Sequence, residues 1–102
     1  MIARIWGALA RPGAAEVYCR HFNEVVLPAL QGIEGFRGAY VLRRPGEPAG
    51  IQVISLWDSL DAVARFAGPD ITLAVVEPAA QAVLSSYDRV VSHHEVAVAA
   101  LR

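Results

Sequence analysis

The chain has 102 residues, of which 55% are hydrophobic and 19% are charged, and its net charge is -1. This composition excludes a disordered chain, and the small net charge gives no reason to expect nucleic acid or an anionic membrane as a partner. All nine basic residues are Arg and there is one Cys, which excludes a lysine Schiff base, an internal disulfide and a multi-cysteine metal site.

The first half of the chain predicts a strand, a helix and a second strand. Residues Ile2 to Leu9 form a compact β-type run. Residues Ala14 to Leu30 place apolar side chains at helical spacing, and we expect Pro28 to kink or loosen the last turn. After a glycine-rich turn, Phe36 to Arg44 is the second predicted strand.

The second half of the chain predicts a strand, two helical segments and a last strand. A loop rich in Pro and Gly leads into a strand over Ile51 to Trp57. A helix follows, with Ser59 or its neighbour as cap and Gly68 at its end. Residues Ile71 to Ser86 are expected to be wholly or partly helical, and Val90 to Val98 reads as the last strand.

The predicted order is β-α-β-β-α-β, so we expect one α+β domain over residues 1–102 with a ferredoxin-like antiparallel sheet. Both faces of this sheet are apolar, as the third strand shows, because Val53 and Trp57 point opposite to Ile54 and Leu56. One layer of helices covers only one face. The pattern therefore predicts a homodimer in which two sheets pack together.

Four sequence motifs occur together along this order. They are I-A-R-I-W at the start, G-F-R-G-A-Y at 35–40, L-W-D-S at 56–59 followed by F-A-G, and a terminal H-x-E-V. With these motifs nearly the whole chain resembles the antibiotic biosynthesis monooxygenase family, whose members belong to the dimeric α/β-barrel superfamily. The resemblance implies two ferredoxin-like subunits whose sheets meet as a barrel.

The resemblance also indicates which reactions to expect. The family includes cofactor-free oxygenases that convert polycyclic phenols or anthrones into quinones, and enzymes that degrade haem; the superfamily adds cyclases, isomerases and dehalogenases. The haem-degrading enzymes use an Asn of the first strand and a Trp and a His of the second helical region. Here the first strand has no Asn, and residues 59–86 contain no His or Trp, which argues against haem degradation.

The three histidines are the candidates for proton transfer. His93 and His94 are adjacent in the last strand, so their side chains point to opposite faces and cannot serve one pocket. The family-like ending H-x-E-V favours His93 as proton acceptor or anion stabiliser, helped by His21 or Tyr40. A structural histidine held by a hydrogen bond is the alternative for His93 and for His94, and a position in solvent is the alternative for His21.

Aromatic side chains of the strands and helices are the candidates for a pocket wall that suits a planar ligand. Plain core packing is the alternative for all of them. Arg4 and Arg37 lie inside predicted strands, where we expect them to pair with Glu95 or Asp88 or across the dimer, or to bind an acidic substrate. The predicted substrate-binding residues are Trp6, Tyr18, Phe22, Trp57, Phe66 and His94.

The leading hypothesis is a cofactor-independent monooxygenase that acts on an aromatic, polyketide-like small molecule, without metal or cofactor. A non-oxidative cyclase, isomerase or lyase with the same base is one alternative, and a small-molecule-binding module without catalysis is another. No stretch resembles a secretory signal or a membrane-spanning helix, so we expect a cytoplasmic protein with no membrane partner.

Overall fold

The computed structural model describes every residue from Met1 to Arg102. In chain order its elements are β1 (Ile2–Ala10), α1 (Ala15–His21), a π-helical segment η1 (Phe22–Val26), α2 (Leu27–Gln31), β2 (Phe36–Arg44), β3 (Gly50–Trp57), α3 (Leu60–Ala67), α4 (Pro78–Val83), β4 (Leu84–Tyr87) and β5 (Ser92–Glu95).

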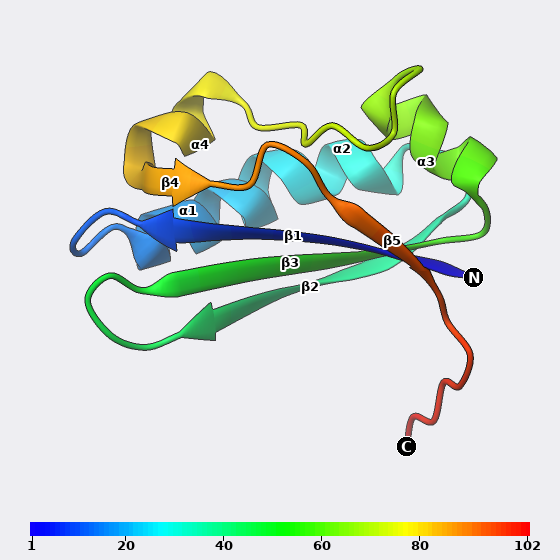
Figure 1. Ribbon diagram of the computed structural model, residues 1–102, viewed down its shortest axis with the longest axis horizontal. Coiled ribbons are helices and arrows are strands. Elements are labelled where there is room, and N and C mark those ends of the chain that lie inside the picture. The colour runs from blue at the N-terminus through cyan, green and yellow to red at the C-terminus, as the bar shows by residue number, and fades with distance from the viewer.

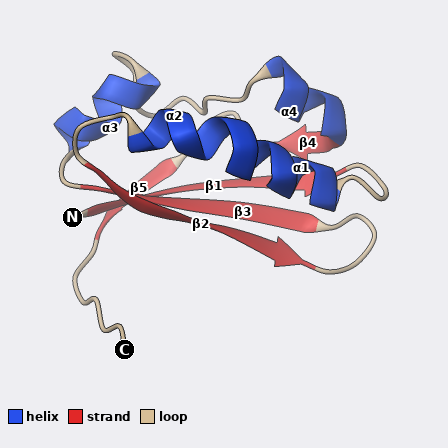
Figure 2. Ribbon diagram, turned by 180° about the vertical axis from the view of Figure 1, so that it is seen from behind, coloured by secondary structure: helices blue, strands red, loops and turns tan.

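The strands form one antiparallel sheet in the order β2-β3-β1-β4, and β5 also pairs with β1. All helices lie on one side of this sheet, as Figures 1 and 2 show from opposite directions. The expected α+β architecture with a ferredoxin-like antiparallel sheet is therefore confirmed. In the central pair of strands, Arg4 lies opposite Ser55 and Trp6 lies opposite Val53.

The helix after β1 is continuous through three segments, and its middle turn is π-helical. The amide of Leu27 donates to the carbonyl of Phe22, five residues back, which widens the turn just before Pro28. A π-turn leaves room for the proline ring, which in a regular α-helix collides with the carbonyl four residues earlier. The predicted loosening is present, and it lies in the turn before the proline.

The core fills the space between the helices and the sheet. Trp57 is 0% exposed; its ring packs edge-on against Phe36 at 5.3 Å and stacks on Phe66 at 5.8 Å between centroids. The Ser59 side chain caps α3 by accepting the amide of Ala62, and Gly68 ends that helix, as expected. Trp57 and Phe66 thus connect β3 to the helix that follows it.

Residues Ile71 to Ser86 are partly helical, because only α4, which begins at Pro78, is a helix. Residues 71–77 have no helix, and their backbone bonds instead to the last strand region, with Ala74 donating to Arg89 and Thr72 accepting from Val91. Glu77 is extended, as the residue before a proline prefers to be. Leu84–Tyr87 is the strand β4, which pairs with the end of β1.

The last predicted strand is shorter than expected, and β4 pairs with the same edge of β1. Only Ser92–Glu95 forms β5, which pairs with the first half of β1, while β4 pairs with its second half. Beyond β5 the amide of Val96 donates to the carbonyl of Met1, and residues 97–102 have no regular structure. Two short strands therefore replace one long strand along this edge of β1.

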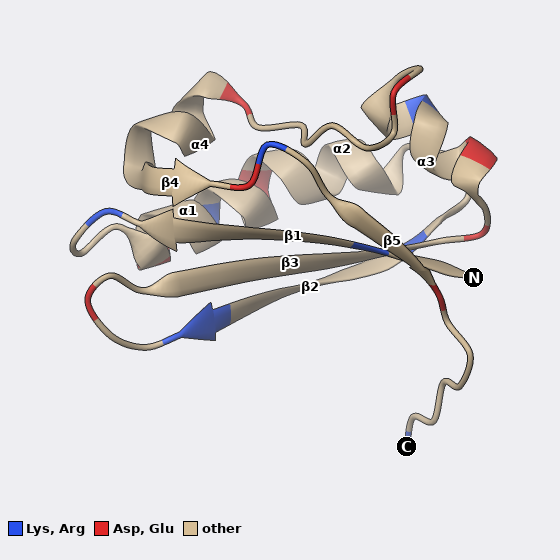
Figure 3. Cartoon of the chain, viewed as in Figure 1, with Lys and Arg blue, Asp and Glu red and all other residues tan.

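The second face of the sheet has no helix over it, as seen below the strands in Figure 1. Figure 3 shows that β1 and β3 carry almost no charged residues. The uncovered face, as we call it from here on, includes Leu9, Tyr40 and Leu42, which are exposed, and Ile5, Ile54 and Leu56, which are half-buried. No helix of the chain is both long and apolar enough to span a membrane.

Candidate functional site

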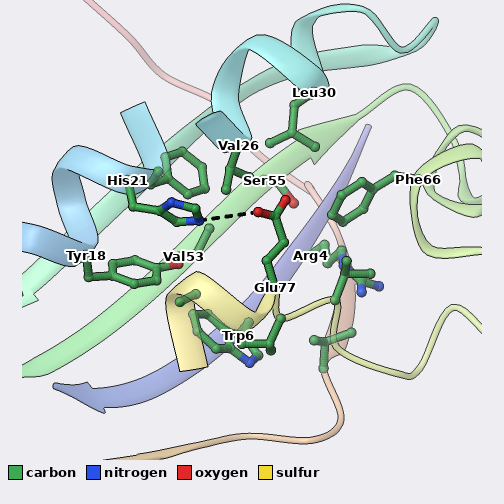
Figure 4. A pocket seen from close by; sticks show the side chains of 15 residues that line it. Arg4, Trp6, Tyr18, His21, Val26, Leu30, Val53, Ser55, Phe66 and Glu77 are labelled. Atoms are coloured by element: carbon green, nitrogen blue, oxygen red, sulfur yellow. Dashed lines mark ion pairs between the residues drawn. The ribbon is translucent and has the colours of Figure 1, made fainter. Parts of the chain in front are cut away.

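A cavity lies between the helix layer and the covered face of the sheet (Figure 4). Its enclosed volume is about 70 Å³, and 11 of its 15 lining residues are hydrophobic. An apolar lining with a few polar groups is typical of sites for small organic molecules. The four polar or charged lining residues are Arg4, His21, Ser55 and Glu77.

The long helix supplies one wall of the cavity. Besides His21, its lining residues are spaced four apart, at Tyr18, Phe22, Val26 and Leu30. In a regular α-helix a step of four residues overshoots a full turn by about 40°, so such a stripe drifts around the helix. The π-turn at 22–26 takes up this drift and keeps all four side chains on the cavity side.

His21 meets Glu77 inside this cavity. The His21 side chain is 14% exposed, and its Nε2 lies 3.4 Å from a carboxylate oxygen of Glu77. The two atoms are close enough for an ion pair, yet the geometry is not that of a hydrogen bond, and Nε2 is buried without a partner. A buried nitrogen of this kind is costly to leave unsatisfied, which is typical of a functional position.

Tyr18 and Trp6 form the aromatic floor beside this pair. Their rings lie 6.0 Å apart between centroids, and the Trp6 indole donates to the Asp88 carbonyl at 2.8 Å. Burial, together with Cys19 and Glu77 nearby, raises the pKa of Tyr18 above its usual range. The Tyr18 hydroxyl therefore stays protonated at neutral pH and can donate a hydrogen bond to a ligand.

Arg4 is 4% exposed and has no carboxylate partner. Its Nη1 donates to the Ile71 carbonyl at 2.5 Å and contacts His93 Nε2 at 3.0 Å, and its Nη2 donates to the Leu73 carbonyl at 2.7 Å. The expected pairing of Arg4 with Glu95 or Asp88 is wrong, because the irregular segment 71–77 supplies neutral carbonyl acceptors instead.

Arg37 does have an acidic partner, although not one of those expected. Its Nε lies 2.6 Å from Asp58, and both side chains are largely exposed. The bulge in β2 between Phe36 and Gly38 places Arg37 there, next to the residue that follows β3. Arg37 is therefore part of a surface ion pair and lies outside the cavity.

His93 and His94 point to opposite faces, as the alternation in the strand predicted. His93 lies on the side of the helices, but it lies behind Arg4 and does not line the cavity. Because Arg4 can only donate, His93 Nε2 must accept, which places the ring proton on Nδ1. Burial, Arg4 and His94 all lower the pKa of His93. In this arrangement His93 holds Arg4 in place, and its accepting nitrogen is not free for a substrate.

The structure separates the remaining candidates. Tyr40 is 53% exposed on the uncovered face, and His94 lies on that face too, with its Nε2 2.9 Å from the Ser92 hydroxyl. Trp57 is buried behind the wall, with its indole donating to Ser55. These three residues cannot touch a ligand in the cavity of their own chain. The predicted residues that do line one cavity are Trp6, Tyr18, His21, Phe22 and Phe66.

Sequence reasoning missed Glu77 and Ser55. Glu77 stands directly after an apolar run and directly before Pro78, so its charge interrupts a stretch that otherwise belongs to the core. That position was a usable signal, because a residue before proline is extended and points away from the helix that follows. One imidazole and one carboxylate meet in the cavity, and the chain contains no group of three potential metal-ligating side chains.

Solved structures share this fold along the whole chain. A protein of unknown function from Nitrosomonas europaea matches with a TM-score of 0.69 and 22% identity, over 99% of this chain and 93% of that chain. Proteins from Bacillus cereus and Chloroflexus aurantiacus, both named provisionally as antibiotic biosynthesis monooxygenases, match with TM-scores of 0.65 and 0.61 and identities of 15% and 19%. They cover 99% of this chain and 95% and 96% of their own.

At these identities the structural matches show a shared fold and carry no activity with them. None of the curated proteins matches the chain. The sequence profile described as antibiotic biosynthesis monooxygenase matches residues 1–78, which include β1 to α3 and all four polar or charged residues of the cavity lining. The chain therefore belongs to the antibiotic biosynthesis monooxygenase family.

Proposed function

We propose that the protein is a cofactor-independent monooxygenase that acts on an aromatic, polyketide-like small molecule. One observation carries this proposal. The buried Nε2 of His21 lacks a hydrogen-bond partner and lies beside Glu77 on the wall of an apolar, aromatic-lined cavity. Such a cavity holds a flat ring by apolar contact and limits the access of water.

Oxygenation without a cofactor requires the substrate to supply the electrons that reduce O₂, so the substrate must first lose a proton. His21 Nε2 accepts that proton, and the carboxylate of Glu77 stabilises the imidazolium that forms. The hydroxyl of Tyr18 donates to the substrate oxygen on which negative charge develops. His21 thereby takes the role that the sequence suggested for His93, whose accepting nitrogen is occupied by Arg4.

For a tricyclic ketone with a ring CH₂ group, the reaction balances without another reactant. The anion formed by proton loss reacts with O₂, and the CH₂ carbon becomes a second carbonyl. The remaining oxygen atom leaves as water together with the two hydrogens of that carbon. The substrate itself supplies all the electrons, and His21 returns its proton to the departing oxygen.

The proposal includes a homodimer that is joined through the uncovered faces of two sheets. Its support is the apolar character of that face, which includes Ile54, Leu56 and Leu42. The cavity lies on the other side of the sheet, so each subunit keeps its own site.

Oxygen uptake with a hydroxylated anthrone tests the proposal. We expect metal-free protein to consume O₂ and form the quinone, and His21→Gln to slow turnover by about 100-fold, as loss of a general base does. Glu77→Gln should slow it by about tenfold, since the imidazolium loses its partner. Arg20→Gln, on the exposed side of the same helix, is the matched control and should retain full activity.

Two outcomes would reject this function. Product formed at an undiminished rate under strict anaerobiosis would show a non-oxidative enzyme, such as a cyclase, isomerase or lyase. Tight binding of the anthrone without any turnover, in the presence of O₂, would show a binding module.

A further inference from the structure

Arg4 is the only cationic side chain of the cavity lining apart from the titratable His21, and its charge is not neutralised by a carboxylate. It lies near the start of β1 on the covered side of the sheet, and 4% of its surface is exposed. A buried guanidinium without an anionic partner is expensive, and removing its charge by pKa change is not open to Arg at physiological pH. The chain nevertheless holds this cation rigidly at the cavity wall.

The bonds that hold Arg4 leave part of its donor set free. Nη1 serves the Ile71 carbonyl and His93 Nε2, and Nη2 serves the Leu73 carbonyl. The Nε–H and one N–H of Nη2 have no acceptor in the protein. Unused N–H groups of a guanidinium bind the oxygens of a carboxylate through charge-assisted hydrogen bonds.

Ser55 provides a second polar group at the same place. It lies directly opposite Arg4 across the β1–β3 pair, is 6% exposed and lines the cavity. Its oxygen accepts the indole N–H of Trp57 at 2.9 Å, and its own O–H has no acceptor. The protein therefore holds Ser55 in place, as it holds Arg4, and leaves the Ser55 O–H available to donate to a ligand.

We propose that Arg4 and Ser55 form an anion subsite, and that the ligand of the cavity is an aromatic molecule that carries a carboxylate. In Figure 4 Arg4 and His21 lie on opposite sides of the cavity, so the carboxylate end of the ligand lies away from the base. The inference rests on the proposed function only in taking this cavity as the substrate site. It adds the charge of the substrate and its orientation.

Glu77 is the one carboxylate of the lining that competes for Arg4. Its oxygen lies at His21, and no ion pair joins it to Arg4. If Glu77 were the natural partner of Arg4 in solution, the subsite would already be filled. The experiment must therefore distinguish a ligand carboxylate from the side chain of Glu77.

Equilibrium binding of naphthoate and of its neutral amide tests the subsite without any turnover. The two probes share the ring system and differ in charge, and calorimetry at neutral pH measures both. We expect wild-type protein to bind naphthoate about tenfold more tightly, as charge-assisted bidentate hydrogen bonds permit. Arg4→Met should bring the ratio of the two affinities to about one, and Ser55→Ala should reduce it about threefold.

Matched variants separate this result from the proposed function. His21→Gln should keep the preference for naphthoate while it loses turnover, so oxygen uptake and anion preference fail independently. Arg4→Lys keeps the charge without the planar edge and should give an intermediate ratio. The comparison of the two probes on wild-type protein needs no variant, so it decides the question even if Arg4→Met does not fold.

Equal affinity of the wild-type protein for both probes would overturn the inference. So would a preference for naphthoate that survives in Arg4→Met. If Glu77→Gln binds naphthoate selectively while the wild-type protein does not, Glu77 is the anion that Arg4 takes, and the proposed ligand carboxylate is rejected.

Discussion

At the scale of single residues, the contact between Arg4 and His93 makes the fold sensitive to acid. Arg4 donates to His93 Nε2, which can accept only while that nitrogen carries no proton. Burial, followed by the charges of Arg4 and His94, lowers the pKa of His93 below its ordinary value of 6.5. Protonation of His93 therefore places a positive charge against the guanidinium and removes its acceptor.

This contact gives a prediction for stability against pH. Because the pKa of His93 is lower in the folded chain, the unfolded chain binds more protons from just above pH 6.5 downward, and stability falls as the pH falls. His93→Gln keeps an acceptor for Arg4 and does not titrate. We expect the melting temperature of the wild-type protein to fall more steeply than that of His93→Gln between neutral pH and pH values below 6.5. Parallel curves in calorimetry would contradict this.

At the scale of elements, the π-turn at Phe22–Val26 decides which side chains of the long helix reach the cavity. A π-turn contains one residue more than the corresponding turn of a regular α-helix. Glu24 lies in this turn and is exposed. If Glu24 is deleted, Tyr18, Phe22, Val26 and Leu30 acquire spacings of four, three and four, which place them on one side of a regular α-helix.

We therefore predict that deletion of Glu24 is tolerated once Pro28 is replaced by Ala, because a regular α-helix has no room for the proline ring. The free energy of unfolding of this double variant should differ by about 1 kcal/mol or less from that of Pro28→Ala alone, because the buried side chains keep their places. Deletion of Ala64 from the regular helix α3 is the matched control. It turns Phe66 by about 100° away from Trp57 and should cost roughly 3 kcal/mol or more. Denaturant unfolding measures both, and equal losses would refute the role assigned to the π-turn.

The elements also show where reasoning from sequence succeeds. Alternation correctly separated Trp6 from Ile5 in β1 and Val53 from Ile54 in β3, because the period of a strand is a local property. The extent of helix within residues 71–86 could not be predicted, because the apolar run 71–77 suits helix and strand equally and its partners lie in the last strand region. The approach of Glu77 to His21 depends on how α4 packs on α1, and no local pattern encodes that contact.

At the scale of the whole molecule, the sheet has one side covered by helices and one side that no part of the chain covers. Ile54 lies in the central strand pair, opposite Ile5, with Tyr40 next to it on β2. Natural proteins rarely expose a continuous apolar surface of this kind to water. A small domain also gains more from association than a large one, because it buries a smaller fraction of its own surface.

We predict that Ile54→Arg converts a dimer into a monomer. In a two-fold dimer each subunit contributes one introduced guanidinium group, and the two groups would meet near the centre of the interface. The repulsion between like charges and the loss of apolar burial both oppose association there. Sedimentation velocity should show a wild-type dimer at micromolar concentration and a variant that sediments as a monomer with a lower melting temperature. Val17→Arg, on the exposed side of α1, is the control and should remain dimeric. A wild-type protein that sediments as a monomer would reject the dimer and leave the apolar face without an explanation.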